Sequence, residues 1–127
     1  MQVVIPSQTV EVADQGVIEL INDDSNQILQ GQPCYISGDG RAKKASAMSR
    51  ATCTGIVFLD DSQTIVQVGA AGKFRNSGFI TSPDPLVPGS TYFLGINYGT
   101  MIQNDAPPLP NETVELGVAV TQFKLAI

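Results

Sequence analysis

Short apolar runs separated by glycine and proline recur along the chain, and this pattern predicts strands. The 12 glycines and 8 prolines make up 20 of the 127 residues, above the usual share of about 12%. The runs between them are rich in Val, Ile, Thr, Tyr and Phe, as is typical of strands bounded by turns. Apolar and polar residues alternate at 9–12 and partly at 64–68, and 114–120 fits a more fully buried strand. The sequence therefore predicts an all-β fold.

One segment, 42–50, has a helix-like composition. We expect a small-residue strand or loop there, because the turn sequence Gly38, Asp39, Gly40 comes directly before it. Residues 105–110 include three prolines, which lack the N–H that a central strand must donate. That segment is predicted to be an exposed extended connection.

A phrase of turn glycine, aromatic strand and second glycine occurs twice, at 31–38 and at 89–95. A further matching strand follows each copy, near Gly55 and Gly117. The repetition predicts two similar halves, 28–72 and 86–127, although such phrases also recur by chance in β proteins. Each half has few apolar residues, so the halves are expected to close on one another into a single small β-barrel or sandwich. The residues assigned to structural turns are Gly31, Gly38, Gly40, Gly89, Gly95 and Gly99.

The chain is predicted to be one domain, 26–127, preceded by an extended N-terminal arm or edge strand, 1–25. The arm contains an apolar strip of Val3, Val4, Ile5 and Pro6, which could add as a strand to the sheet edge of a neighbour. An edge strand of the protein's own barrel explains the strip equally well.

The net charge of −5 is the sum of two acidic ends and a basic middle. Residues 1–40 carry −6, residues 41–75 carry +4 and residues 76–127 carry −3. An acidic chain is a poor general nucleic-acid binder. Scattered surface charge is the simple explanation, and contact between the basic middle and an acidic neighbour is the alternative. The candidate contact residues are Arg41, Lys43, Lys44, Arg50, Lys73 and Arg75.

The chain has no His and no Trp, which removes Ser-His chemistry, His-ligated zinc and a histidine pH switch. No phosphate-binding glycine loop is present. The acid pairs Asp23–Asp24 and Asp60–Asp61 stand beside Ser, Asn or Gln and indicate turns; calcium coordination is the lesser alternative. We therefore expect neither an enzyme nor a cofactor or metal.

Cys34 and Cys53 are 19 residues apart and lack the spacing of a metal or redox pair, so buried free thiols are expected, with a disulfide as the alternative. The aromatic residues are expected to pack in the core and turns, with a sugar-stacking surface as the alternative; these residues are Tyr35, Tyr92, Phe93 and Tyr98. The longest apolar runs have five residues, far short of the ~20 of a membrane helix. We therefore do not expect the protein to bind membranes, and we expect it to be made in the cytoplasm.

In order and spacing, a series of phrases resembles a β module of tailed-bacteriophage virion proteins, found in capsid cement or decoration proteins and in head and tail fibres. The phrases cover 26–127 and read NQILQGQPCYISG (26–38), ASA (45–47), TGIV (54–57), VGAAG (68–72), LVPGSTYFL (86–94), GTMI (99–102), PP (107–108) and LGVA (116–119).

The resemblance implies a non-enzymatic structural protein of the virion. Such a protein binds the outer surface of the phage head and stabilises contacts between major capsid protein subunits, and its copies commonly form trimers. The expected partners are therefore the major capsid protein and further copies of this chain. A tail-fibre or baseplate receptor-binding module is the alternative that the same resemblance allows.

Overall fold

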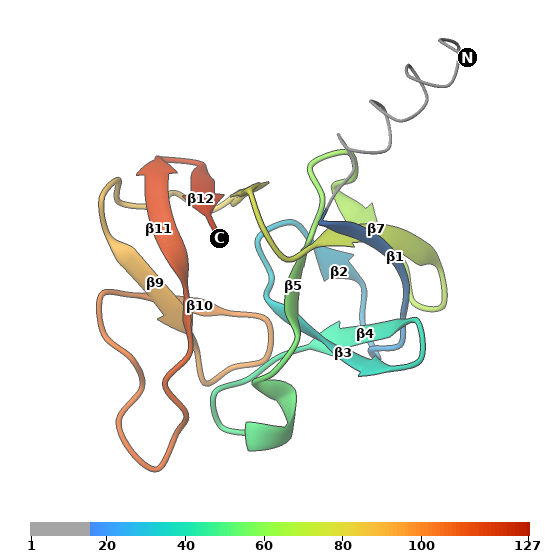
Figure 1. Ribbon diagram of the computed structural model, residues 1–127, viewed down its shortest axis with the longest axis horizontal. Coiled ribbons are helices and arrows are strands. Elements are labelled where there is room, and N and C mark those ends of the chain that lie inside the picture. Colours follow the sequence, from blue (N-terminus) through green and yellow to red (C-terminus); the bar gives the residue numbers. More distant parts are fainter. Residues whose placement is uncertain (1–15) are drawn as a thin grey trace, which may run out of the picture.

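The computed structural model describes residues 16–127, which form an all-β structure with one short 3₁₀ helix (Figure 1). The elements are β1 (Val17–Asn22), β2 (Ile28–Leu29), β3 (Cys34–Gly38), β4 (Arg41–Lys44), η1 (Arg50–Thr52), β5 (Ile56–Leu59), β6 (Ile65–Val66), β7 (Ala71–Arg75), β8 (Phe79–Thr81), β9 (Thr91–Leu94), β10 (Met101–Gln103), β11 (Glu115–Thr121) and β12 (Lys124–Ala126). The all-β prediction is confirmed.

The first half is a closed barrel of five strands in the order β1-β4-β3-β5-β7. β1 closes the ring because it pairs antiparallel with β7 on one side and parallel with β4 on the other. Alternation along the strands points one set of side chains inward. The barrel core consists of Leu20, Ile28, Cys34, Ala42, Val57, Leu59, Val66 and Phe74. The short pair β2 and β6 adds Ile28 and Val66 to this core.

The second half is a five-stranded sheet in the order β10-β9-β11-β12-β8. The two sheets have the same strand order. When the strands of each half are numbered from its first strand, with the separate pair β2 and β6 left out, the order in both sheets is third, second, fourth, fifth, first. The difference lies in closure, because β8 pairs with β12 and, unlike β1, has no second partner strand among residues 16–127. The two similar halves predicted from the repeated phrase are thus present, one closed and one open.

The open sheet packs its inner face against the barrel, beside which it lies in Figure 1. A second core fills this junction. It combines Ala45, Ala47 and Phe58 from the first half with Ile80, Leu86, Tyr92, Leu94, Leu116, Ala119 and Leu125 from the second. Phe58 is 1% exposed although its neighbours in β5, Val57 and Leu59, point into the barrel. β5 therefore contributes to both cores, one on each face.

Three details differ from the sequence-based expectation. Residues 17–22, which were assigned to the arm, form a barrel strand paired on both sides, because Leu20 is needed to fill the barrel core. The barrel closes within the first half, and the repeat begins near 17 rather than 28. The segment 42–50 splits into the end of β4 and a loop that leads to the short helix η1. The apolar strip at 3–6 lies outside the described residues.

Candidate interaction surfaces

The six basic residues of the middle segment lie on three elements rather than in one patch. Arg41, Lys43 and Lys44 are on β4, Lys73 and Arg75 on β7, and Arg50 on η1. β4 and β7 both flank β1, so five of the six lie on neighbouring barrel strands.

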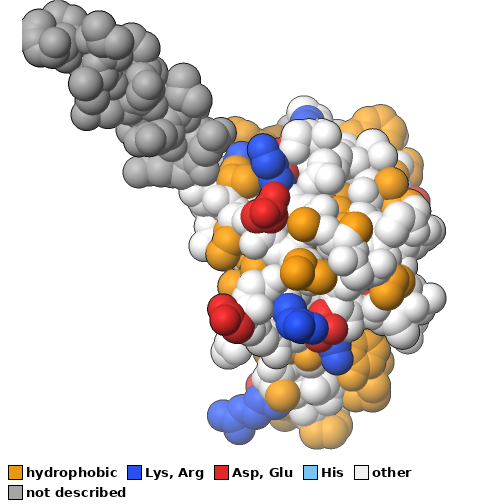
Figure 2. Space-filling model, turned by 90° about the vertical axis from the view of Figure 1, so that its right-hand side faces the viewer, with side chains coloured by type: hydrophobic (Ala, Val, Ile, Leu, Met, Phe, Trp, Pro, Cys, Tyr) orange, Lys and Arg blue, Asp and Glu red, His pale blue; other side chains and the backbone are white. Residues whose placement is uncertain are grey.

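Acidic side chains accompany several of these bases. The Arg41 guanidinium lies 3.3 Å from Asp23, and Arg75 Nε lies 2.8 Å from Asp60. Lys73 is the cross-strand partner of Glu19. Figure 2 accordingly shows Lys and Arg side chains beside Asp and Glu side chains on this side of the molecule. The basic middle of the sequence becomes a surface of mixed charge.

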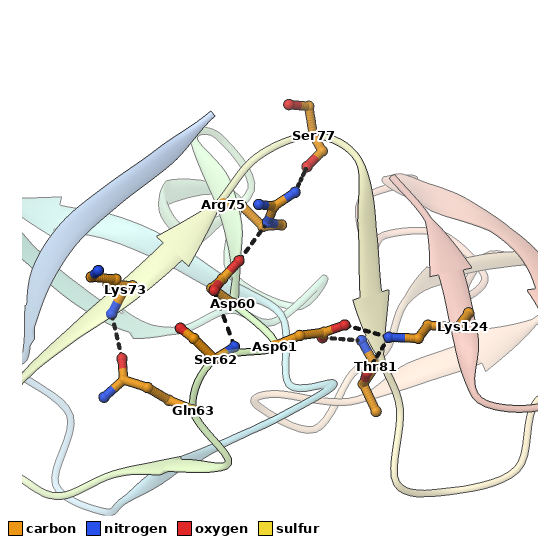
Figure 3. A network of polar contacts seen from close by, with 9 residues as sticks. All are labelled: Asp60, Asp61, Ser62, Gln63, Lys73, Arg75, Ser77, Thr81 and Lys124. Atoms are coloured by element: carbon orange, nitrogen blue, oxygen red, sulfur yellow. Dashed lines mark hydrogen bonds and ion pairs between the residues drawn. The ribbon is translucent and has the colours of Figure 1, made fainter. Parts of the chain in front are cut away.

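Asp60 and Asp61 are adjacent in sequence but serve different halves (Figure 3). Asp60 accepts hydrogen bonds from Arg75 of the barrel and from the backbone N–H of Ser62, which is the turn role expected from the sequence. Asp61 instead reaches the second half, where it accepts from the backbone N–H of Thr81 at 2.9 Å and from the Lys124 ammonium. Asp61 therefore ties the open sheet to the barrel.

Hydrogen bonding changes the titration of both carboxylates. Partial burial alone raises the pKa of Asp61, but the bonds from Lys124 and Thr81 outweigh it and hold the pKa below its ordinary value of 3.8. Burial likewise opposes the bonds from Ser62 and Arg75 at Asp60, and the net effect again lowers the pKa. Both groups are thus stabilised as carboxylates in the folded protein.

Both cysteines are free thiols, Cys34 buried and Cys53 half-buried. Burial in the barrel core, with a smaller contribution from Asp24, raises the pKa of the Cys34 thiol to about 12. Cys34 therefore behaves as a small apolar core residue, as the sequence suggested.

The glycines assigned to turns do not all act in the same way. Gly31, Gly40, Gly89 and Gly99 have positive φ, whereas Gly38 and Gly95 do not. Gly38 ends β3 beside a register shift. A side chain at Gly95 would collide with Thr100 Oγ1, so this glycine permits a close approach of two chain segments.

Three loops, the β4–β5, β9–β10 and β10–β11 connections, meet toward the lower end of the molecule in Figure 1. Backbone bonds join them: Ala47 N donates to Gly95 O at 2.9 Å, and Glu112 N donates to Ala47 O at 2.7 Å. Large apolar side chains in these loops face solvent; Met48 is 60% exposed, Ile96 42% and Leu109 88%. We call Met48, Ile96 and Leu109 the apolar tip.

The apolar tip was not predicted from the sequence. The prolines around Leu109 did indicate an exposed connection, and residues 104–114 form one. The loops that carry Met48 and Ile96 are brought to this connection by contacts between the two halves. The local sequence contains no signal for those contacts.

A groove of about 440 Å³ opens between the end of β8 and the start of β10. The turn between β2 and β3 forms one wall, the segment after β8 forms the other, and Tyr92 and Leu86 lie within the lining. The residues around the groove are Leu29, Gln30, Gly31, Gln32, Ser82, Pro83, Asp84, Pro85, Leu86, Tyr92, Gly99, Thr100 and Met101.

A second hollow of about 590 Å³ lies beside the exposed Tyr98, with Asp23, Asp24, Ser25, Asn26, Lys43 and Lys44 around it. Of the four aromatic residues considered for a sugar surface, Tyr92 is buried in the junction core, with its hydroxyl accepting from Val87 N at 2.8 Å. Tyr35 packs against the same core. Phe93 is half-buried, so Tyr98, which is 51% exposed, is the most exposed aromatic residue of that set.

No family model matches the chain, and no curated protein or solved structure is significantly similar to it. Within residues 16–127, His, Cys, Asp and Glu side chains form no group of three or more that could hold a metal ion. In the same residues no helix is long and apolar enough to cross a membrane.

Proposed function

We propose that this chain is a capsid decoration protein that binds the outer surface of a tailed-phage head and stabilises contacts between major capsid protein subunits. The apolar tip is the observation that supports the proposal. Three exposed apolar side chains lie on loops that are joined by backbone hydrogen bonds, and joined loops lose less entropy on docking than free ones. Many such contacts over a shell sum to stable attachment even where each is weak.

The mixed-charge barrel face contributes less to this binding. Arg41 and Arg75 already have carboxylate partners in the same chain, so an acidic coat surface would compete with internal pairs. Lys43, Lys44, Lys73 and Arg50 are the remaining basic side chains of the set. Occupancy that falls steeply with salt would assign them a large share of the binding, and we expect a shallow dependence.

The test is a count of copies in purified virions of the phage that encodes the chain, by quantitative mass spectrometry. A decoration protein gives hundreds of copies per particle. A handful of copies would contradict the proposal and indicate a tail component.

A matched pair of variants tests the contact surface. Purified Met48→Asp and Leu109→Asp proteins, added to heads that lack the protein, should bind at least tenfold more weakly than the unmodified chain. Val68→Asp changes a side chain of similar exposure, 56%, outside the apolar tip, and should bind normally. Equal binding by all three variants would reject the apolar tip as the docking surface.

A receptor-binding module of a fibre or baseplate is the second candidate, and the hollow beside Tyr98 favours it. An exposed aromatic ring next to amide, carboxylate and ammonium groups is a suitable surface for a sugar. A glycan array probed with the unmodified chain and with Tyr98→Ala separates the two candidates. Binding to a defined glycan that depends on Tyr98 would support the receptor role.

A further inference from the structure

The hollow beside Tyr98 lies between the two halves of the chain. Tyr98 belongs to the β9–β10 connection, whereas Lys43 and Lys44 of β4 and the β1–β2 loop form the rest of the lining. Gly99 N donates to Ala45 O at 2.8 Å, which holds the connection against the end of β4. A Cβ atom at Gly99 would lie 2.9 Å from Lys44 Cδ, so only a glycine lets the Lys44 stem approach so closely. The fold thereby places Tyr98 and Lys44 at one hollow.

A buried side chain shapes the loop on the other side of the hollow. Asn22 is 1% exposed, and its amide group donates to Asn26 O and Val66 O, both at 3.0 Å. Its side-chain oxygen accepts from Asp24 N at 2.8 Å. These bonds hold residues 23–26 in a defined turn, so the lining is ordered before a ligand arrives.

The two carboxylates at the hollow already have partners in the chain. Asp24 accepts from Asn26 N at 3.2 Å with one oxygen and from Lys44 N at 2.9 Å with the other. Asp23 lies 3.3 Å from the Arg41 guanidinium, whose positive charge offsets its own. The acidic side chains therefore do not leave the hollow with an uncompensated negative charge.

The ammonium groups at the hollow are uncommitted. The ion pairs among residues 16–127 involve neither Lys43 nor Lys44. An ammonium group can only donate hydrogen bonds, so a ligand that satisfies both lysines must supply acceptors. Bonds from an ammonium group to a carboxylate are stronger than bonds between neutral groups. The hollow is therefore better suited to an anionic ligand than to a neutral one.

We propose that the hollow binds a sugar that carries a carboxylate, as hexuronic acids and sialic acids do. The ring of Tyr98, which is 51% exposed, packs on the apolar face of the sugar. The sugar carboxylate accepts from the ammonium groups of Lys43 and Lys44. Its hydroxyl groups bond to the exposed side chains of Ser25 and Asn26 in the same lining. This inference rests on the second candidate of the proposed function and deepens it, because it names the class of sugar.

A glycan array tests the charge requirement with the full chain. It presents oligosaccharides of hexuronic acids and sialylated glycans beside their methyl esters, which keep the ring and lose the charge. The acids should bind at least tenfold more strongly than the esters. Their binding should also weaken as salt is raised, because ions screen the attraction between exposed charges. Equal, Tyr98-dependent binding of acids and esters would overturn the acidic sugar and leave the receptor role supported.

A matched pair of lysine variants tests the site. Lys44→Met removes the ammonium group but keeps an apolar stem beside Gly99, so binding of the acids should fall at least fivefold and binding of the esters should not change. Lys73→Met makes the same charge change on β7, outside the lining of the hollow, and should bind normally. Unchanged binding by Lys44→Met, or an equal loss in both variants, would overturn the assignment to this hollow.

The outcomes also separate this inference from the functions proposed above. Binding to no sugar at all would overturn both the acidic sugar and the receptor-binding candidate. The capsid role would be unaffected by that result, because the number of copies per virion tests it independently.

Discussion

Asp61 is expected to stabilise the junction of the two halves, and replacing it tests this directly. Asp61→Ala removes the acceptor for the Thr81 amide and the partner of Lys124. A hydrogen bond of this type contributes about 1 kcal/mol net. The ion pair adds only about 0.5 kcal/mol, because the side chains of Lys124 and Asp61 are 42% and 36% exposed and water screens them. The free energy of unfolding should therefore fall by about 1–2 kcal/mol.

Asp61→Asn separates the two contributions. The amide oxygen can still accept from Thr81, so only the ion pair is lost and the cost should be about 0.5 kcal/mol. Urea unfolding followed by circular dichroism measures both variants; a slope near 2 kcal/mol per molar places the Asp61→Ala midpoint ~0.5–1 M lower. Asp39→Asn makes the same charge change at an exposed turn and should leave the midpoint unchanged.

The pH dependence follows from the lowered pKa of Asp61. A carboxylate whose pKa is lower in the folded than in the unfolded chain contributes stability that is present above its ordinary pKa of 3.8 and is lost as pH falls through the folded value. The difference in unfolding free energy between the unmodified chain and Asp61→Ala should shrink on acidification below pH 3.8. A constant difference, or an Asp61→Asn variant as unstable as Asp61→Ala, would refute the reasoning.

Three further results are expected from other parts of the structure. Gly117→Ala places a methyl group against a carbonyl of β12 and should cost about 1–3 kcal/mol in urea unfolding, whereas Gly38→Ala makes only an ordinary contact with Arg41 Cδ at 3.9 Å and should be nearly neutral. Phe58→Ala empties part of the junction core and should cost about 3–5 kcal/mol, far more than Phe79→Ala at a 57% exposed site. Cys34 should resist iodoacetamide at pH 8 in native protein and react after denaturation, as mass spectrometry of the peptides would show.

Much of the fold could be predicted because local chemistry determines it. Glycines such as Gly31 and Gly89 mark turns. The apolar run at 114–120 correctly predicts a strand, β11, but not its burial, because Val118 and Val120 are exposed. The closing role of β1 was missed because its value lies in pairing with β4 and β7, which are distant in sequence. A strand that seals a ring has the same local pattern as an arm or an edge strand.

The candidate surfaces were harder to predict than the strands. The basic residues were visible in the sequence, but their partners Asp23 and Asp60 are brought to Arg41 and Arg75 by pairing within the barrel. The dual role of the acid pair was also hidden, because only the placement of the second half brings Lys124 to Asp61. Charge along a chain therefore indicates which groups are present and not which of them remain available.

The difference between a closed and an open half bears on how the chain acquires its structure. The barrel has a core drawn wholly from residues 20–74, so its apolar interior needs no residue of the second half. The open sheet has no such independence, because Ala47 and Phe58 of the barrel fill its inner face. A barrel without residues 79–127 would expose that apolar face, so the second half both covers the first and depends on it for its own core.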